Sequence, residues 1–201
     1  FVIPEDVTTI GDNAFWFCCE KSPLKELTIS KNVKTIEEEA FAYTKLDKLI
    51  LLANVETVVE PKYAYRPNHF EGDYNWICGV DELVLDGEAL QMSVENKIKL
   101  FSEANVRKLT LPADYPGEIS GKTLAAFSTL EEVGFTEEND KYMIVNSMVL
   151  SKDGKTLYAI PASNVNYMEI VVPESVTTIK TDAFYAPSGK KKYPVSKVTI
   201  P

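Results

Sequence analysis

The sequence has few of the side chains that enzymes and metal sites most often use. It holds one histidine, His69, and three cysteines, Cys18, Cys19 and Cys78. A single histidine excludes a cluster of histidine ligands and any relay that needs a second imidazole. No Gly-rich phosphate loop, CxxC pair or serine elbow is present. The sequence therefore predicts a protein that is not an enzyme, with no catalytic residues, no cofactor and no bound metal.

Basic charge and long apolar runs are also scarce. Lysine and arginine number 21 against 30 aspartates and glutamates, which gives a net charge of −9. Proteins that bind nucleic acid or anionic lipid headgroups rely on basic surfaces, so both partners are disfavoured. No apolar run approaches the roughly 20 residues that span a bilayer. The chain also lacks a signal peptide at its start, and we expect any export signal to lie outside this sequence.

What the sequence does contain is one six-residue pattern that occurs seven times. Near the end of each copy, two apolar residues alternate with a polar or small one, the period of a half-buried strand. The copies are Leu24–Ile29, Leu46–Leu51, Val80–Leu85, Val106–Leu111, Leu130–Phe135, Tyr167–Val172 and Val195–Ile200. Their last residues are 22 to 37 residues apart, and most of these steps lie in or near the range of leucine-rich repeats.

A second pattern follows the first in residues 2–15, 28–41 and 171–184, where Val-x-x-Ile precedes Ala-Phe. We expect Val-x-x-Ile to form a short extended stretch and Ala-Phe a helical turn whose ring fills the core. Longer repeats predict a helix within residues 87–104 and a shorter one around residues 122–128. The rings expected to be almost fully buried are Phe15, Phe41, Phe101, Phe127 and Phe184.

A single repeat cannot bury its apolar face, so repeats must stack. The predicted fold is a leucine-rich-repeat solenoid, a right-handed stack with a parallel β-sheet on one face and short helices, turns and short strands on the other. We expect one domain over residues 1–201 and one continuous sheet through all seven copies. The central outward residues would then form a row with mostly alternating charge: Glu26, Lys48, Glu82, Lys108, Glu132, Glu169 and Lys197.

These units resemble the BspA-like (treponemal-type) leucine-rich repeat family. Residues Ile3–Cys18 match its pattern almost fully, and Val172–Phe184 match up to a missing Gly and Cys. The stretch Tyr142–Pro161 is also similar to that family, with Asp153-Gly154 suited to a tight hairpin. The resemblance implies a surface or secreted protein of a host-associated bacterium or protist, a role in adhesion, and a buried structural thiol at Cys18.

Two readings of function follow. The first is a non-catalytic protein-binding or adhesion module of a cell-surface or secreted protein, located outside the cell. Its partner would be a host extracellular-matrix protein or another cell-surface protein. The alternative is an architectural stalk that spaces another domain of the parent protein. Because the sequence begins and ends inside predicted strands without a polar capping repeat, we expect it to be a fragment of a longer repeat array.

Two surfaces are candidates for partner binding. Residues 65–76 exceed what the third repeat needs, and insertions in repeat proteins often form the binding edge. The rings that this insertion supplies are Tyr65, His69, Phe70, Tyr74 and Trp76. These rings could instead fold back and cap the irregular third repeat. The second candidate is a shallow row of small or β-branched side chains on the sheet, which includes Thr28, Ile50, Val84 and Thr110.

The three cysteines are expected to be free thiols. Cys18 and Cys78 would lie about two repeats apart, on the order of 10 Å, which exceeds the roughly 5.5–6 Å between Cα atoms that a disulfide needs. A bridge between the adjacent residues Cys18 and Cys19 would be of a rare type.

Overall fold

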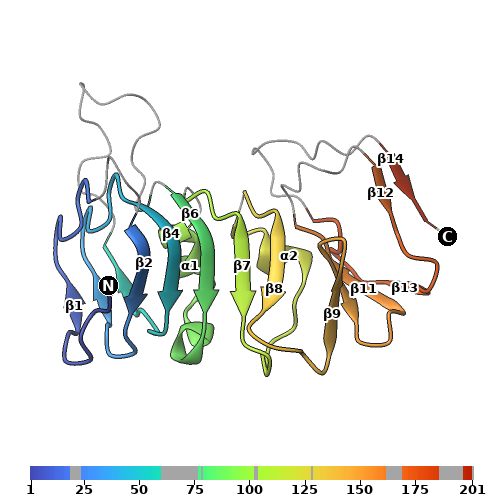
Figure 1. Ribbon diagram of the computed structural model, residues 1–201, viewed down its shortest axis with the longest axis horizontal. Coiled ribbons are helices and arrows are strands. Elements are labelled where there is room, and N and C mark those ends of the chain that lie inside the picture. The colour runs from blue at the N-terminus through green and yellow to red at the C-terminus, as the bar shows by residue number, and fades with distance from the viewer. Residues whose placement is uncertain are drawn as a thin grey trace. The chain divides into compact units, whose positions relative to one another are not determined.

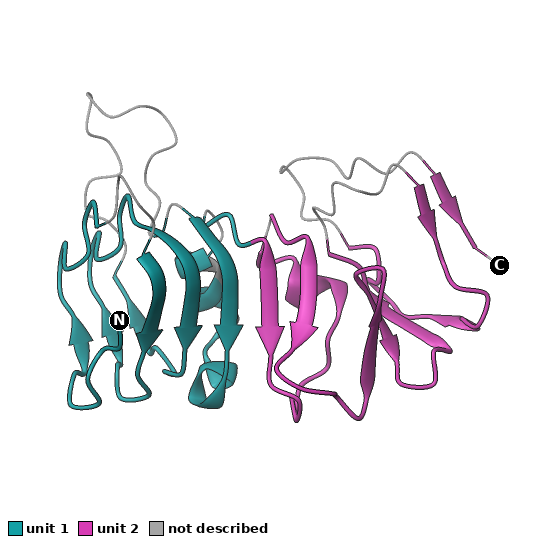
Figure 2. Ribbon diagram, viewed as in Figure 1, with its two compact units in different colours: residues 1–106 teal, residues 107–201 magenta. Residues whose placement is uncertain are grey.

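The computed structural model describes residues 1–18, 24–59, 77, 79–101, 104–127, 129–161, 169–185 and 197–200, without the side chains of Val94 and Ile98. The chain divides into two compact units (Figure 2), unit 1 at residues 1–106 and unit 2 at residues 107–201. Each unit is described by itself. The expected single domain over residues 1–201 stays a prediction.

Unit 1 is built on parallel strands β2 (Leu24–Ile29), β4 (Lys45–Leu51) and β6 (Gly79–Leu85), which lie side by side in Figure 1. Their pairing is in register, so equivalent residues of successive repeats are neighbours. The inward residues of these strands are buried: Leu27, Leu49 and Leu83 at one level, and Ile29, Leu51 and Leu85 at the next. The predicted strands and their inward pairs are confirmed for these three repeats.

A second parallel sheet in unit 1 contains β1 (Thr9–Ile10), β3 (Thr35–Ile36) and β5 (Thr57–Val58). Each of these two-residue strands ends the Val-x-x-Ile or Val-x-x-Val segment of its repeat. Their last residues are buried. The short extended stretch expected after each long strand is therefore confirmed, and the core lies between the two sheets.

The long repeat that follows β6 in unit 1 forms the predicted helix in two pieces. A 3₁₀ helix, η1, spans Gly87–Gln91, and α1 spans Val94–Phe101. The Oγ of Ser93 accepts a hydrogen bond from the N–H of Asn96 at 3.1 Å, as a residue capping a helix does. The side-chain amide of Asn96 donates to the carbonyls of Val55 and Glu56, at 2.9 and 3.0 Å, and so fixes α1 against the preceding repeat.

The predicted phenylalanine anchors are buried to different degrees. Phe41, Phe101 and Phe127 are 0%, 1% and 3% exposed, as expected. The prediction is wrong for Phe15 and Phe184, which are only half-buried. The ring of Phe15 stacks on the ring of Phe41, with centroids 5.0 Å apart. Its other ring contact is with Phe1, which it meets edge-on at 6.1 Å between centroids. Phe184 packs at the margin of the apolar core of unit 2.

In unit 2, β7 (Lys108–Leu111) and β8 (Glu132–Phe135) pair in parallel and in register. The short helix α2 (Gly121–Leu124) begins after Ser120, whose Oγ accepts from the N–H of Thr123 in a capping box. The last two strands, β12 (Glu169–Val171) and β14 (Lys197–Thr199), form a separate parallel pair. The predicted sheet running through all seven copies is therefore wrong.

The sheet is interrupted because a hairpin region lies between β8 and β12. Strands β9 (Tyr142–Val145), β10 (Met148–Ser151) and β11 (Thr156–Ala159) are antiparallel, and β11 then pairs in parallel with β13 (Thr178–Ile179). The turn between β10 and β11 contains Asp153-Gly154, with φ of +70° at Gly154, so the hairpin expected there is confirmed. Beyond it, the expected inward residues Val198 and Ile200 are 41% and 60% exposed.

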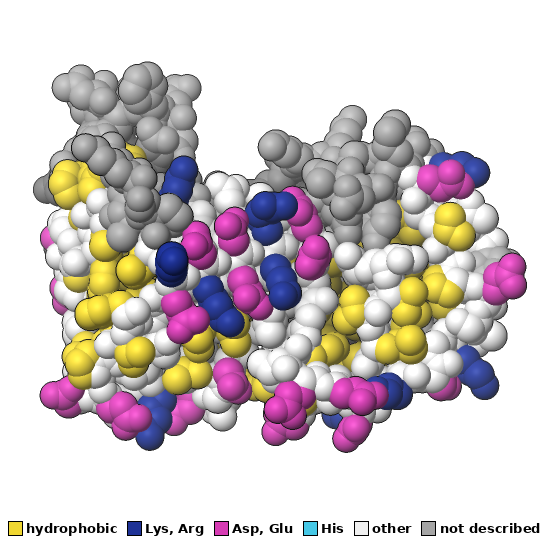
Figure 3. All heavy atoms as spheres, in the orientation of Figure 1, with side chains coloured by type: hydrophobic (Ala, Val, Ile, Leu, Met, Phe, Trp, Pro, Cys, Tyr) yellow, Lys and Arg dark blue, Asp and Glu magenta, His cyan; other side chains and the backbone are white. Residues whose placement is uncertain are grey.

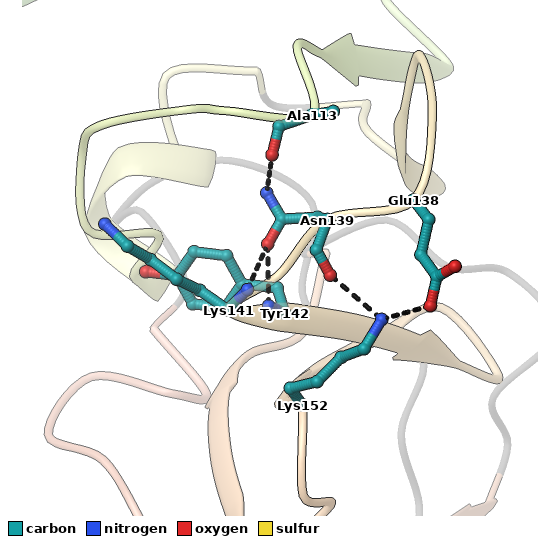
Figure 4. A network of polar contacts seen from close by, with 6 residues as sticks. All are labelled: Ala113, Glu138, Asn139, Lys141, Tyr142 and Lys152. Carbon is teal, nitrogen blue, oxygen red and sulfur yellow. Dashed lines mark hydrogen bonds and ion pairs between the residues drawn. The ribbon is translucent and has the colours of Figure 1, made fainter.

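A buried asparagine fixes the start of the hairpin region (Figure 4). Asn139 is 3% exposed, and its Oδ1 accepts from the N–H groups of Lys141 at 2.8 Å and Tyr142 at 2.7 Å. Its Nδ2 donates to the carbonyl of Ala113 at 2.6 Å, in the turn that follows β7. One side chain thus joins the start of β9 to a segment 26 residues earlier.

Replacing Phe41 with alanine should lower the free energy of unfolding by about 3–5 kcal/mol, the usual cost of truncating a buried phenylalanine. The matched change Phe15→Ala should cost clearly less, because that ring is already partly in solvent. Denaturant unfolding followed by circular dichroism measures both variants. Equal losses would contradict the difference in burial between the two rings.

Replacing Asn139 with alanine should destabilise the chain by about 2–4 kcal/mol, since it leaves a carbonyl and two N–H groups without their partner. The exposed neighbour Asp140 offers a control, and Asp140→Asn should change stability by less than about 0.5 kcal/mol. The same denaturant experiment compares them. Similar values for the two variants would show that Asn139 does not hold the hairpin region.

The hydrogen bond and then the charge of Lys152 hold the pKa of Glu138 below its ordinary value. A lowered folded-state pKa means that the stabilisation is present above the unfolded-state pKa and is lost as the pH falls through the folded-state value. An NMR titration of the Glu138 carboxyl should therefore move to higher pH in Lys152→Met. Lys141→Met, which removes a lysine whose side chain lies elsewhere in Figure 4, should leave the Glu138 titration in place.

Candidate functional site

Within each group of paired strands, the outward charged residues lie opposite one another as the sequence predicted, but the predicted single row is interrupted between β8 and β12. In unit 1, Lys48 lies opposite Glu26 on one neighbouring strand and opposite Glu82 on the other. The Lys48 ammonium is 3.7 Å from a carboxylate oxygen of Glu82. In unit 2, Lys108 lies opposite Glu132, and the Glu169 carboxylate binds the Lys197 ammonium. Figure 3 shows acidic and basic side chains interspersed on this face. Exposed pairs of this kind contribute about 0–1 kcal/mol each and mainly keep the face polar.

The structure confirms part of the predicted row of small side chains on the sheet. Thr28, Ile50 and Val84 are neighbours in register on β2, β4 and β6, whereas Thr110 lies on β7 in unit 2. Thr28 and Ile50 are half-buried, but Val84 and Thr110 are each only 7% exposed. Residues two apart on a strand share a face, so long charged side chains stand beside these short ones. The expected accessible surface is therefore wrong for Val84 and Thr110.

The predicted aromatic insertion lies outside the described residues. This applies to all five of its members, Tyr65, His69, Phe70, Tyr74 and Trp76, whose role stays a prediction. Cys18 takes part in no disulfide and is half-buried, so the buried thiol that the resemblance implied is wrong. Cys19 and Cys78 lie outside the described residues.

A hollow of about 460 Å³ in unit 2 is lined mainly by residues 135–144 and Lys152. Its central polar groups are already bonded within the fold, since Asn139 has its three partners and Lys152 binds Glu138 and the Asn139 carbonyl. We regard it as part of the hairpin framework. Within the described part of the chain, no three His, Cys, Asp or Glu side chains gather as metal ligands, and no helix is long and apolar enough to cross a membrane.

A cluster of rings in unit 1, Trp16, Phe17 and Tyr43, is the strongest candidate site, and we name it the aromatic edge. Phe17 and Tyr43 stack with centroids 4.5 Å apart and planes at 13°. Trp16 meets both rings edge-on, at 4.5 Å from Phe17 and 6.5 Å from Tyr43. Trp16 is 47% exposed and Phe17 38%. Large rings in contact with each other and open to solvent are typical anchors of protein interfaces.

The backbone of two successive repeats holds the aromatic edge in place. The N–H of Phe15 donates to the Ala40 carbonyl at 2.7 Å, and the N–H of Phe17 donates to the Ala42 carbonyl at 3.0 Å. Phe17 and Tyr43 occupy equivalent positions, and both have left-handed backbone, with φ of +52° and +59°. This conformation is unfavourable for bulky residues and is concentrated at functional sites. The rings are therefore presented on a fixed framework.

The aromatic edge was not predicted from the sequence, although the sequence contains a signal for it. Each repeat needs one ring after alanine, which Phe15 and Phe41 supply. The residues beyond them, Trp16, Phe17 and Tyr43, add rings at positions that the repeat pattern leaves open. A search for aromatic residues that the repeat pattern does not require, next to a buried phenylalanine, would have identified the site.

Comparison with known proteins supports the repeat assignment. The family described as BspA type Leucine rich repeat region (6 copies) matches residues 1–68. A comparison with curated proteins finds no match.

Two solved structures are similar over most of the chain. A leucine-rich repeat protein from Eubacterium ventriosum is 17% identical with a TM-score of 0.44, over 98% of this chain and 48% of that one. The pneumococcal vaccine antigen PcpA is 15% identical with a TM-score of 0.38, over 98% of this chain and 56% of that one. The chain thus spans about half the length of each of these proteins. The stacked parallel strands form a solenoid of the leucine-rich-repeat type, and residues 1–68 match the BspA-type repeat family.

Proposed function

We propose that the chain is a non-catalytic protein-binding or adhesion module of a cell-surface or secreted protein. The observation that carries this proposal is the aromatic edge. Its rings stand outside the core, which Phe41 already fills, and two of the three are more than a third exposed. Rings that serve only stability would be buried, because their apolar area stabilises the fold when it leaves water.

The repeat architecture supports the same proposal. In a solenoid each repeat contacts its neighbours, so side chains at equivalent positions form extended rows on a rigid frame. Such a frame suits a protein partner better than a small molecule, which is usually held in an enclosed apolar pocket. We propose a host extracellular-matrix protein or another cell-surface protein as the partner, with the module located outside the cell.

The experiment is a binding assay with the immobilised chain against a panel of purified matrix proteins, by biolayer interferometry. We expect at least one to bind, and the triple change Trp16→Ala, Phe17→Ala and Tyr43→Ala to weaken it about tenfold or more, as loss of interface rings does. Thr28→Ala with Ile50→Ala is the matched control on the sheet and should bind as the original chain does. Circular dichroism must show that all variants remain folded at the assay temperature.

One result would contradict the proposed binding function, and another would move the binding site away from the aromatic edge. If no matrix protein binds, and beads coated with the chain adhere to cells no better than uncoated beads, the architectural stalk becomes the better interpretation. If binding occurs but is lost only in the Thr28 and Ile50 variant, the sheet is the binding surface. A further double change, Tyr74→Ala with Trp76→Ala, tests the predicted insertion independently.

A further inference from the structure

The aromatic edge lies beside several carboxylates. Its two turn segments, residues 11–18 and 37–44, contain Asp12 and Glu37–Glu39 but no lysine, arginine or histidine. Backbone hydrogen bonds join these segments side by side, from Asn13 N–H to the Glu38 carbonyl and from Phe15 and Phe17 to the next repeat. Acidic charge and exposed rings are thus gathered on adjacent turns.

Within the described ranges, Asp12, Glu37 and Glu39 take part in no ion pair. The Glu37 carboxylate accepts only the N–H of Asp12, at 3.1 Å, and Asp12 accepts only the side-chain amide of Asn13, at 2.7 Å. Some other carboxylates do have a cation close by. Examples in unit 1 are Glu5 with Lys31, Glu56 with Lys34, and Glu82 with Lys48. Asp12, Glu37 and Glu39 are therefore not neutralised by a cation within the described part of the chain.

Unit 2 shows what the equivalent turn binds. Residues 182–185, Asp-Ala-Phe-Tyr, correspond to residues 13–16, Asn-Ala-Phe-Trp. Asp182 and Asn13 have the same left-handed backbone, with φ of +63° and +56°. Each carbonyl accepts from the aromatic residue three positions later, Tyr185 at 2.9 Å and Trp16 at 3.0 Å. The two turns are therefore the same structure with different side chains.

The turn of unit 2 is occupied by a lysine from another repeat. The Lys122 ammonium lies 3.0 Å from a carboxylate oxygen of Asp182 and 5.9 Å from the centroid of the Tyr185 ring. A second example is close to it in the same unit, where Lys180 lies 5.6 Å from the Tyr158 ring centroid and 4.0 Å from Glu118. In both cases a cation lies near a ring and a carboxylate together, a favourable arrangement of cation–π and ionic attraction.

The described residues of unit 1 supply the ring and the acid of this arrangement, and none of them supplies the lysine. Trp16 stands where Tyr185 stands, and tryptophan is the ring that attracts cations most strongly. Asn13 replaces Asp182, but the next repeat places Glu39 at the same position, with φ of +54°. Adjacent repeats lie roughly 4.8 Å apart, a shift that a long lysine or arginine side chain can follow.

We infer that the aromatic edge binds a lysine or arginine side chain of the partner protein, with its cation beside Trp16 and Tyr43 and paired with Glu37 or Glu39. This inference rests on the proposed protein-binding function and names the chemistry of the partner. A partner that presents basic residues in an exposed segment fits the site. The cation would complete in unit 1 the arrangement that Lys122 completes in unit 2.

The test is an NMR titration of the ¹⁵N-labelled chain with a Gly-Ser peptide that carries three arginines. We expect the peptide to shift the indole N–H signal of Trp16, which the variant Trp16→Phe identifies. The same peptide with citrulline in place of arginine keeps the shape and removes the charge. It should bind about tenfold more weakly. Equal binding of the two peptides would overturn the inference, as would a stronger shift with a neutral oligosaccharide.

Matched variants locate the binding. Glu37→Gln with Glu39→Gln should weaken the arginine peptide severalfold, whereas Asp47→Asn with Asp81→Asn, which removes two exposed charges from the strands of the same unit, should not. Trp16→Ala with Tyr43→Ala should abolish binding, and Trp16→Phe with Tyr43→Phe should restore most of it. Equal losses in the two charge variants would mean general attraction to an acidic chain and would overturn the inference.

The same variants separate this inference from the proposed function. A matrix protein that loses affinity with Trp16→Ala and Tyr43→Ala, but not with Glu37→Gln and Glu39→Gln, would leave the binding function in place. It would show that the rings make apolar contacts and that the cation is absent from the interface.

Discussion

The structure depends on the in-register stacking of one repeat on the next. A single repeat exposes its apolar residues above and below, and only the neighbouring repeat can cover them. Parallel pairing at equal register sets Leu27, Leu49 and Leu83 at one level, where each is 1% exposed or less. The same pairing determines every other row, because a shift by one residue would turn the inward side chains of a strand outward. Phe15 shows what incomplete stacking does: its ring stacks on Phe41 of the next repeat, has no such stacked ring on its other side among the described residues, and is half-buried.

The periodic part of the fold could be predicted from the sequence. The spacing of the apolar residues is a local pattern, and in-register stacking reproduces it in each successive repeat. The long strands, the short second strands, the opposition of Glu26, Lys48 and Glu82, and the turn at Asp153-Gly154 all follow from it. The break in the predicted sheet between β8 and β12 could not be predicted in this way. It depends on a hairpin region that Asn139 holds in place. The side chain of Asn139 bonds to the backbone of Tyr142 nearby and to the backbone of Ala113, 26 residues earlier, and no local pattern reveals such a contact.

The candidate site was less predictable than the fold, for a related reason. Accessibility depends on neighbours in other repeats, so Val84 and Thr110, outward by pattern, are buried in fact. The aromatic edge likewise joins rings 26 residues apart, and only the structure shows that Phe17 and Tyr43 stack. A repeat pattern describes the positions that the repeats share, whereas binding uses the positions at which they differ.

Stacking also explains how one turn can serve two purposes. Because the backbone of the Asn13 and Asp182 turns is the same, each presents a ring three residues after a left-handed residue, whatever the side chains are. In unit 2 a lysine from the chain itself lies against that ring and the carboxylate, and the arrangement contributes to the fold. In unit 1 the ring is kept, the acid is supplied by the neighbouring repeat, and no basic residue occurs in either turn. A contact that one repeat makes internally is thereby left open in another, where a basic side chain from outside the chain can complete it.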